Sequence, residues 1–288
     1  MTRPPSSIRF ASPLIHEIRG KGYTPVDMHI HTRHSDGAIR IPSLLARARH
    51  LGIGVAITDH HEIGGVIEAL DHPCDVLVIP GIELASLEGA HILLYFYSPG
   101  DLADYFATWI RGDRKKGQFM APQLPVQQIL ETAAEYRCVK VAAHPFGYFG
   151  INRGVLKCID RKTLPPGILR HIDGIEVICG AMGQDLNEKA AGYASEHVLP
   201  ITGGSDAHTL PSVGGVVTGV RAGTVRGFLD GILSRKCIVI GSTASPLHRG
   251  MNAGVIAWTF LPSAVSSLQV SYEESIPRLK QYLGNLLK

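Results

Sequence analysis

Short apolar runs alternate with amphipathic runs along this chain, and most of the apolar runs end in a histidine or a carboxylate. This alternation is typical of parallel βαβ units. The first elements are expected as a strand in VDMHIHT (26–32), a helix in IPSLLARARHLG (41–52) and a strand in VAITDH (55–60). Because the carboxyl ends of parallel strands meet at one edge of an α/β fold, the polar residues at these ends should lie close together.

The same pattern continues over the rest of the chain. The run AHILLYFY (90–97) should pair with VLVIPGIELA (76–85) across the turn SLEG. Further strands are expected at 139–145, 174–180, 199–208 and 237–242, and further helices at 64–70, 101–116, 123–137, 184–197 and 224–236.

One domain over residues 1–288 is the economical interpretation, because the chain shows no internal repeat and no low-complexity linker. Its core is expected over about 26–242. Residues 146–170 are rich in Gly, Pro and cationic groups, and they interrupt the alternation as an insertion or lid. Residues 243–288 are interpreted as a C-terminal extension that ends in a surface helix at 273–287.

Composition narrows the class of protein. With 45% apolar and 18% charged residues, the chain belongs with globular proteins and not with disordered ones. The net charge of +3 is mild, and the cluster RGDRKK (111–116) suits a solvated helix end better than a nucleic-acid surface. A stable nucleic-acid partner is therefore not expected.

The cysteines and the apolar stretches predict the cellular compartment of the protein. Five cysteines without a CxxC spacing are typical of a reducing compartment. The first twenty residues lack the apolar core of a signal peptide, and the longest apolar stretch (253–265) is too short to span a bilayer. These features predict a cytoplasmic protein without a membrane partner.

Nine strand-end residues have side chains that bind metals. His29 and His31 are two residues apart on a strand, so both imidazoles point to the same face, and Asp206 and His208 repeat this spacing. Imidazoles and carboxylates together suit Zn, Mn or Fe. The alternative is a set of inward-facing polar residues satisfied by backbone partners. The nine candidate metal ligands are His29, His31, Asp36, His60, Glu83, His91, His144, Asp206 and His208.

The order of the motifs DMHIHT, SDG, TDH, GIE, AHP and GSDAH resembles the PHP (polymerase and histidinol phosphatase) superfamily over about residues 26–242. The resemblance implies a distorted seven-stranded β/α barrel, two or three divalent metal ions and phosphoester hydrolysis. It implies that the first metal is bound by His29, His31 and Asp206 with Glu83 bridging, the second by Glu83, His91 and His144, and the third by Asp36, His60 and His208. In this family the ligand in the region of His91 moves between subgroups.

Four other residues are candidates for supporting or substrate-binding roles. Asp59 adjoins His60 and suits either proton handling behind the ligands or a plain backbone acceptor. His34 and His61 adjoin ligand motifs and are interpreted as substrate-facing or supporting residues. The family often places a phosphate-binding arginine soon after AHP; here the nearest one is Arg153, either a phosphate clamp or a solvated loop cation.

The function predicted from these features is a stand-alone PHP phosphoesterase that hydrolyses a small phosphomonoester or a nucleotide phosphate through a metal-bridging hydroxide. One alternative is amidohydrolase-type C–N hydrolysis, which also begins from HxH on a barrel. That superfamily needs a bridging lysine, and Lys140 precedes the core of its strand. The other alternative is a non-catalytic metal-binding or regulatory module.

Overall fold

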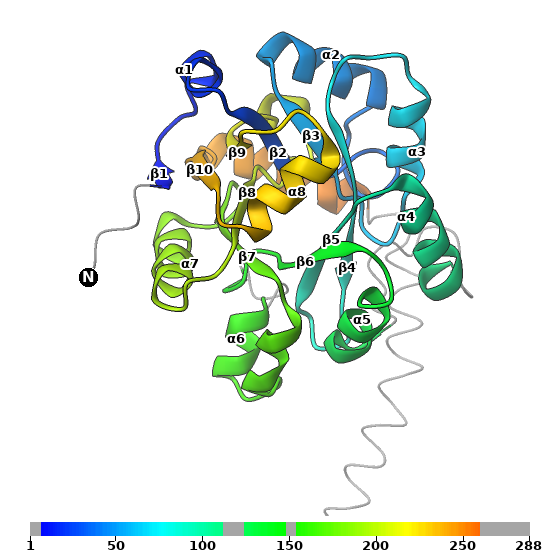
Figure 1. The fold of residues 1–288 in the computed structure, drawn as a ribbon, viewed down its shortest axis with the longest axis vertical. Coiled ribbons are helices and arrows are strands. Elements are labelled where there is room, and N and C mark those ends of the chain that lie inside the picture. Colours follow the sequence, from blue (N-terminus) through cyan, green and yellow to red (C-terminus); the bar gives the residue numbers. More distant parts are fainter. Residues whose placement is uncertain (1–6, 112–123, 148–153, 260–288) are drawn as a thin grey trace, which may run out of the picture.

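The strands form one curled sheet, and the helices lie around its outside (Figure 1). The structure, a computed structural model, describes residues 7–111, 124–147 and 154–259. The strands in these residues are β1 (Ile8–Phe10), β2 (Thr24–Ile30), β3 (Gly54–Ile57), β4 (Val78–Ala85), β5 (His91–Phe96), β6 (Cys138–Ala142), β7 (Gly174–Cys179), β8 (Ile201–Gly204), β9 (Val216–Val220) and β10 (Cys237–Gly241). The α-helices are α1 (Ile15–Gly20), α2 (Ile41–Leu51), α3 (Gly64–Asp71), α4 (Pro99–Tyr105), α5 (Val126–Ala133), α6 (Val155–Asp160), α7 (Gln184–Glu196) and α8 (Val225–Leu233).

The sheet order is β1-β10-β9-β2-β3-β4-β5-β6-β7-β8. β9 runs antiparallel to β10 and β2, and β5 runs antiparallel to β4 and β6, whereas the other neighbours are parallel. The sheet curls until the chain just beyond β8 meets β2, where Ile30 and Ala207 form a parallel bridge. The described residues thus contain ten strands and not the expected seven, partly because the N-terminal β1 adds to β10 beyond β9.

The helix α2 shows how the local sequence sets an element. Proline lies in its first turn, and Gly52 ends it in the left-handed conformation with φ 71°. Its buried residues Ile41, Leu44, Leu45 and Ala48 follow helical spacing, so one stripe packs against the sheet. The predicted helix at 41–52 is therefore confirmed almost to the residue.

Other boundaries differ from the expected ones for local reasons. The helix expected at 101–116 begins earlier, as α4, because Ser98 accepts a hydrogen bond from the backbone N–H of Asp101 and caps it. It continues as a π-helical turn over Phe106–Ile110. The helix expected at 123–137 is limited to α5, and the one at 224–236 to α8, where Thr224 is the cap.

The N-terminal elements β1 and α1 were not expected, because three- and six-residue elements carry too little periodicity to detect. Within the expected insertion, the described residues form α6 and a 3-10 turn at Pro166–His171, and Phe146 and Leu156 pack with Ala190 of α7. In the C-terminal region, residues 246–259 are helical, whereas the helix expected at 273–287 lies outside the described residues. Among the described helices, none has both the length and the apolar character needed to cross a bilayer.

Candidate metal centre

All nine candidate ligands lie together at one end of the curled sheet, and each is at most 6% exposed. The parallel strands bring them there at their carboxyl ends: β2 contains His29, His31 comes directly after β2, and β4 contains Glu83. His91 is instead the first residue of β5. Because β5 is antiparallel to β4, its beginning lies at the same end of the sheet as the end of β4.

Glu83 lies at the middle of this cluster, and both of its carboxylate oxygens are used. Its Oε2 is 3.1 Å from the Nε2 atoms of both His29 and His31. Its Oε1 is 3.0 Å from His91 Nδ1 and 3.0 Å from His144 Nε2. One carboxylate therefore faces two sets of imidazoles, as a bridging ligand between two cations would.

The possible ligand atoms form four overlapping groups in which all atoms lie within 4.8 Å of one another. Two of these groups match the ligand sets expected for the first and the third metal, except that His31 belongs to both groups. The expected second metal divides between two groups, because Glu83 pairs with His144 beside His29 and with His91 beside His60. The groups are His29, His31 and Asp206; His31, Asp36, His60 and His208; His29, Glu83 and His144; and His60, Glu83 and His91.

Several ring nitrogens are directed at carboxylates without completing hydrogen bonds. His31 Nδ1, His60 Nδ1 and His208 Nε2 are buried and lack a hydrogen-bond partner among the described residues. The first lies 3.7 Å and the third 3.3 Å from the Asp36 carboxylate, and His60 Nδ1 lies 3.4 Å from Glu83. Buried nitrogen and oxygen atoms that converge in this way, without bonding each other, fit shared divalent cations.

Electrostatics keep the carboxylates of the cluster charged. Burial raises the pKa of Glu83, but the imidazoles of His29, His60 and His91 oppose it and hold that pKa well below its ordinary value. The pKa of Asp206 is likewise held well below its ordinary value, because His29 and His31 outweigh burial. Charged carboxylates are the state that binds metal.

Three residues beyond the ends of strands have positive φ angles although they are not glycine: His61 (48°), His144 (27°) and Asp206 (52°). Such conformations are costly for side chains with a Cβ, and they persist where the surrounding structure demands them. Two of the three are candidate ligands. The unfavourable backbone conformation therefore coincides with the cluster at His144 and Asp206.

The glycine pair in LPITGGSDAH would suit a sharp turn of the backbone, but the structure gives it a different role. Gly203 and Gly204 do not adopt positive φ angles and so do not make a sharp turn. A Cβ on Gly204 would instead collide with the backbone nitrogen and the Cβ of His29. The absence of a side chain lets β8 approach β2 closely, and this approach brings Asp206 to His29.

Asp59 lies behind the cluster and is fully buried. Its Oδ1 accepts from the Thr32 backbone N–H at 2.6 Å and from the Ser35 hydroxyl at 2.5 Å, and its Oδ2 accepts from the Thr32 hydroxyl at 2.7 Å. Burial raises the pKa of Asp59, and the three donors oppose that rise. The carboxylate holds the loop at 32–35 that leads to Asp36.

The structure describes two of the three candidate substrate residues, and each of these two has its own hydrogen-bond partner. His34 is half-buried, and its Nε2 is 2.6 Å from Glu68 of α3. His61 is buried, and its Nε2 accepts a hydrogen bond from the Ala85 backbone N–H at 3.0 Å, at the end of β4. Arg153 lies outside the described residues.

Two buried carboxylates were missed in the sequence. Glu176 of β7 lies 3.0 Å from His29 Nδ1 and accepts from the His144 backbone N–H at 2.8 Å. Asp27 of β2 accepts from the backbone N–H groups of Ser205 and Gly214, both at 2.8 Å. Both are acids inside apolar strand runs, GIEVIC and PVDMHI, and that was the available signal.

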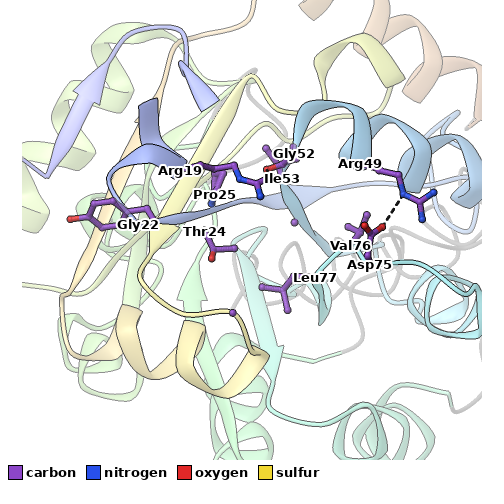
Figure 2. Close-up of a pocket in the computed structure, with 13 residues that line it drawn as sticks. Arg19, Gly22, Thr24, Pro25, Arg49, Gly52, Ile53, Asp75, Val76 and Leu77 are labelled. Atoms are coloured by element: carbon purple, nitrogen blue, oxygen red, sulfur yellow. Dashed lines mark hydrogen bonds and ion pairs between the residues drawn. The ribbon is translucent and has the colours of Figure 1, made fainter. Parts of the chain in front are cut away.

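A cavity of about 430 Å³ lies at the other end of the sheet (Figure 2). Its lining includes Thr24 and Pro25, which begin β2, and Gly54, which begins β3. His29 lies five positions after Thr24 along the strand, which corresponds to roughly 16 Å. Arg49 and Asp75 line this cavity and form an ion pair at 2.9 Å, so the guanidinium of Arg49 already has a negatively charged partner. The cavity is separate from the ligand cluster.

Two family models match the sequence. The PHP domain matches residues 27–148, which contain seven of the nine candidate ligands, and the PHP-associated region matches residues 184–237, which contain Asp206 and His208. No curated protein matches the sequence.

Solved structures of similar fold include PsfC from Pseudomonas syringae PB-5123, which is 21% identical with a TM-score of 0.57 over 82% of this chain and 98% of PsfC. The lesion-specific endonuclease PfuEndoQ from Pyrococcus furiosus is 18% identical with a TM-score of 0.59 over 75% of this chain and 57% of the endonuclease. A candidate metal-dependent phosphoesterase from Bifidobacterium adolescentis is 20% identical with a TM-score of 0.51 over 72% of this chain and 90% of its own.

At these identities the solved structures establish a shared fold, and one of them is an enzyme that acts on DNA lesions. The expectation that nucleic acid is not a partner therefore finds no support in them. PHP proteins are hydrolases that bind divalent metals, and the His, Asp and Glu groups described above fit such sites. The matches over 27–148 and 184–237, together with the ligand cluster that they enclose, show that this chain belongs to the PHP family.

Proposed function

We propose that this protein is a metal-dependent phosphoesterase that hydrolyses a small phosphomonoester or a nucleotide phosphate with two or three divalent cations. Zn, Mn and Fe all suit its nitrogen and oxygen donors. The observation that carries the proposal is the position of Glu83, whose two oxygens each lie about 3 Å from a different pair of imidazoles. Such a residue can hold two cations side by side, as phosphoester hydrolysis with paired metals requires.

Bound divalent cations lower the pKa of a coordinated water and neutralise charge on a phosphate. The side chains of this protein would bind the cations that supply this chemistry. His29, His31 and Asp206 would hold one cation, and Asp36, His60 and His208 would hold another. Glu83 would hold a further cation together with His91 and His144, which both contact its Oε1. Because these side chains are buried, the centre is screened from bulk water, and charge within it acts strongly on a bound phosphate.

Supporting roles follow from the contacts. We infer that Asp59 fixes the loop at 32–35, and so the position of Asp36, because all the described hydrogen bonds of its carboxylate go to that loop. His34 and His61 would shape the rim of the centre. Arg153 stays a prediction: the Arg153→Ala variant should raise KM for phosphorylated substrates, and unchanged kinetics would remove it from the site.

A second candidate substrate is a phosphodiester in nucleic acid, which the fold of the Pyrococcus furiosus endonuclease favours. The two substrates can be compared directly with p-nitrophenyl phosphate and bis(p-nitrophenyl) phosphate, followed by nucleotides and abasic DNA. Preference for the diester would move the assignment to a nuclease. Hydrolysis of p-nitroacetanilide without phosphoester cleavage would favour the amidohydrolase alternative.

The first test is reconstitution of the metal-free protein with Mn²⁺, Zn²⁺ or Fe²⁺, followed by elemental analysis and phosphatase assays. His29→Ala, Glu83→Ala and Asp206→Ala should each lose more than nine-tenths of the activity, because loss of a metal ligand disrupts the whole centre. His50→Ala, an exposed position on α2, is the control and should stay near wild type. Ligand variants that keep more than a tenth of the activity would overturn the assignment.

We also propose a cytoplasmic location. All five cysteines, which include the buried Cys138, Cys158, Cys179 and Cys237, are free thiols. Free thiols are typical of a reducing compartment.

A further inference from the structure

We propose that Glu176 is a positioning residue that orients ligands of two neighbouring cation sites at once, the ring of His29 and the backbone of His144. The inference rests on the proposed function, because it places Glu176 behind the metal centre. Glu176 is the third residue of β7 and is fully buried. It is not among the candidate ligands.

The first contact sets the orientation of the His29 ring. Glu176 Oε1 lies 3.0 Å from His29 Nδ1, and a carboxylate oxygen can only accept there, so Nδ1 carries the proton. The opposite nitrogen, Nε2, then points into the cluster, 3.1 Å from Glu83 Oε2 and 3.1 Å from His31 Nε2. A carboxylate behind a histidine in this way fixes both the ring and the nitrogen that offers its lone pair to a metal.

The second contact holds the backbone at His144. The His144 N–H donates to Glu176 Oε2 at 2.8 Å, at a residue whose φ of 27° is unfavourable for a side chain with a Cβ. In this conformation His144 Nε2 reaches Glu83 Oε1 at 3.0 Å. The hydrogen bond therefore stabilises the backbone conformation that brings the imidazole to the second set of ligands.

The two contacts account for both oxygens of Glu176. Among the described residues its hydrogen-bond partners are these two donors, and no lysine or arginine is paired with it. A buried carboxylate whose described charged partner is the imidazole that it orients adds little to stability by itself, so its position is better explained by what it holds. Because His29 belongs to one ligand group with Asp206 and to another with His144, Glu176 connects two cation sites.

The test compares Glu176→Gln with Glu88→Gln in the full chain. Glu88, in the turn between β4 and β5, accepts from the Val126 backbone N–H at 3.0 Å and has no described hydrogen bond to a candidate ligand, so the same substitution there is the control. A glutamine has the shape of glutamate, but its single carbonyl oxygen can accept from only one of the two donors, and its NH2 faces the other. Mn²⁺ alone is titrated into metal-free protein, with free Mn²⁺ and spin-coupled Mn²⁺ pairs followed by electron paramagnetic resonance.

We expect Glu176→Gln to weaken Mn²⁺ binding by roughly 10- to 100-fold and to lose the spin-coupled signal, with Glu88→Gln within about twofold of wild type. Unchanged affinity and an unchanged pair signal in Glu176→Gln would overturn the proposal, because mere packing is preserved by glutamine. If that variant does not melt cooperatively, Glu176→Asp decides instead: its shorter carboxylate should weaken binding, and wild-type affinity would overturn the proposal. Wild-type protein that binds no Mn²⁺ or Zn²⁺ would overturn the proposed function as well.

Discussion

His31 and His60 lie with ring centroids only 4.5 Å apart, yet they bind protons with very different strength. Burial lowers the pKa of His31, but hydrogen bonds to Asp206 and Glu83 outweigh it and raise that pKa to about 10. Burial holds the pKa of His60 well below its ordinary value. The metal-free centre thus keeps a proton on His31 and none on His60 at neutral pH.

This difference predicts proton release when a metal binds. The folded pKa of His31, about 10, lies above its ordinary value of 6.5, so protonation stabilises the metal-free fold fully below pH 6.5, and this is lost as the pH rises through 10. Between these values a metal must displace the proton. Calorimetric titration with Zn²⁺ at pH 8 in two buffers of different ionisation enthalpy should show release of at least one proton.

The control for proton release is His34→Gln, a half-buried histidine bound to Glu68 outside the cluster, which should release as many protons as wild type. His31→Gln should release about one fewer. Heats of binding that do not depend on the buffer would contradict the assignment of the His31 proton.

At the residue scale the structure confirms that the nine candidate ligands come together, whereas their binding of metal stays a prediction. Four of the nine could be found because the HxH and DxH spacings place side chains on one face of a strand, and the other five because they lie beside apolar strand-like runs. Glu176 could not be found, because one acid in an apolar strand has no spacing partner. The contacts of both Glu176 and Asp27 also depend on neighbours more than a hundred residues away.

At the scale of elements, the closeness of β8 to β2 depends on Gly204. A Cβ there would collide with His29, so Gly204→Ala should lower the free energy of unfolding by about 1–3 kcal/mol and weaken metal binding. Denaturant unfolding and Zn²⁺ titration measure the two effects.

The same substitution at Gly192 is the control, because nothing lies within 4 Å of a Cβ placed at that position in α7. Gly192→Ala should raise stability by roughly 0.5–1 kcal/mol. Equal effects at both positions would contradict the close-packing explanation.

Elements with strong periodicity were predicted well, and the exceptions have physical causes. α2 and the antiparallel pair β4–β5 were expected from the alternation and from the SLEG turn. The antiparallel direction of β9 and the pairing of β1 with β10 were not expected, because strand order depends on pairing between distant segments.

At the scale of the whole molecule, cations should stabilise the fold. A ligand that binds only the folded state adds about 2.7 kcal/mol when its free concentration is 100 times Kd, which corresponds to a rise of roughly 5–10 °C in Tm for a chain of this size. Scanning calorimetry with Zn²⁺ and with a chelator should show this difference. The double variant His29→Ala/Asp206→Ala should show little of it, and an equal rise in the variant would place the stabilising metal elsewhere.

The meeting of β8 with β2 also has a consequence for the order of assembly. Asp27 and Ser205, which are hydrogen-bonded there, are 178 residues apart in the chain, so the contact closes a very long loop. During synthesis His29, His31 and Glu83 emerge well before Asp206 exists. In the proposed centre, the first cation would therefore have its full set of ligands only after β8 and Asp206 have been synthesised. Tight metal retention would then distinguish finished chains from nascent ones.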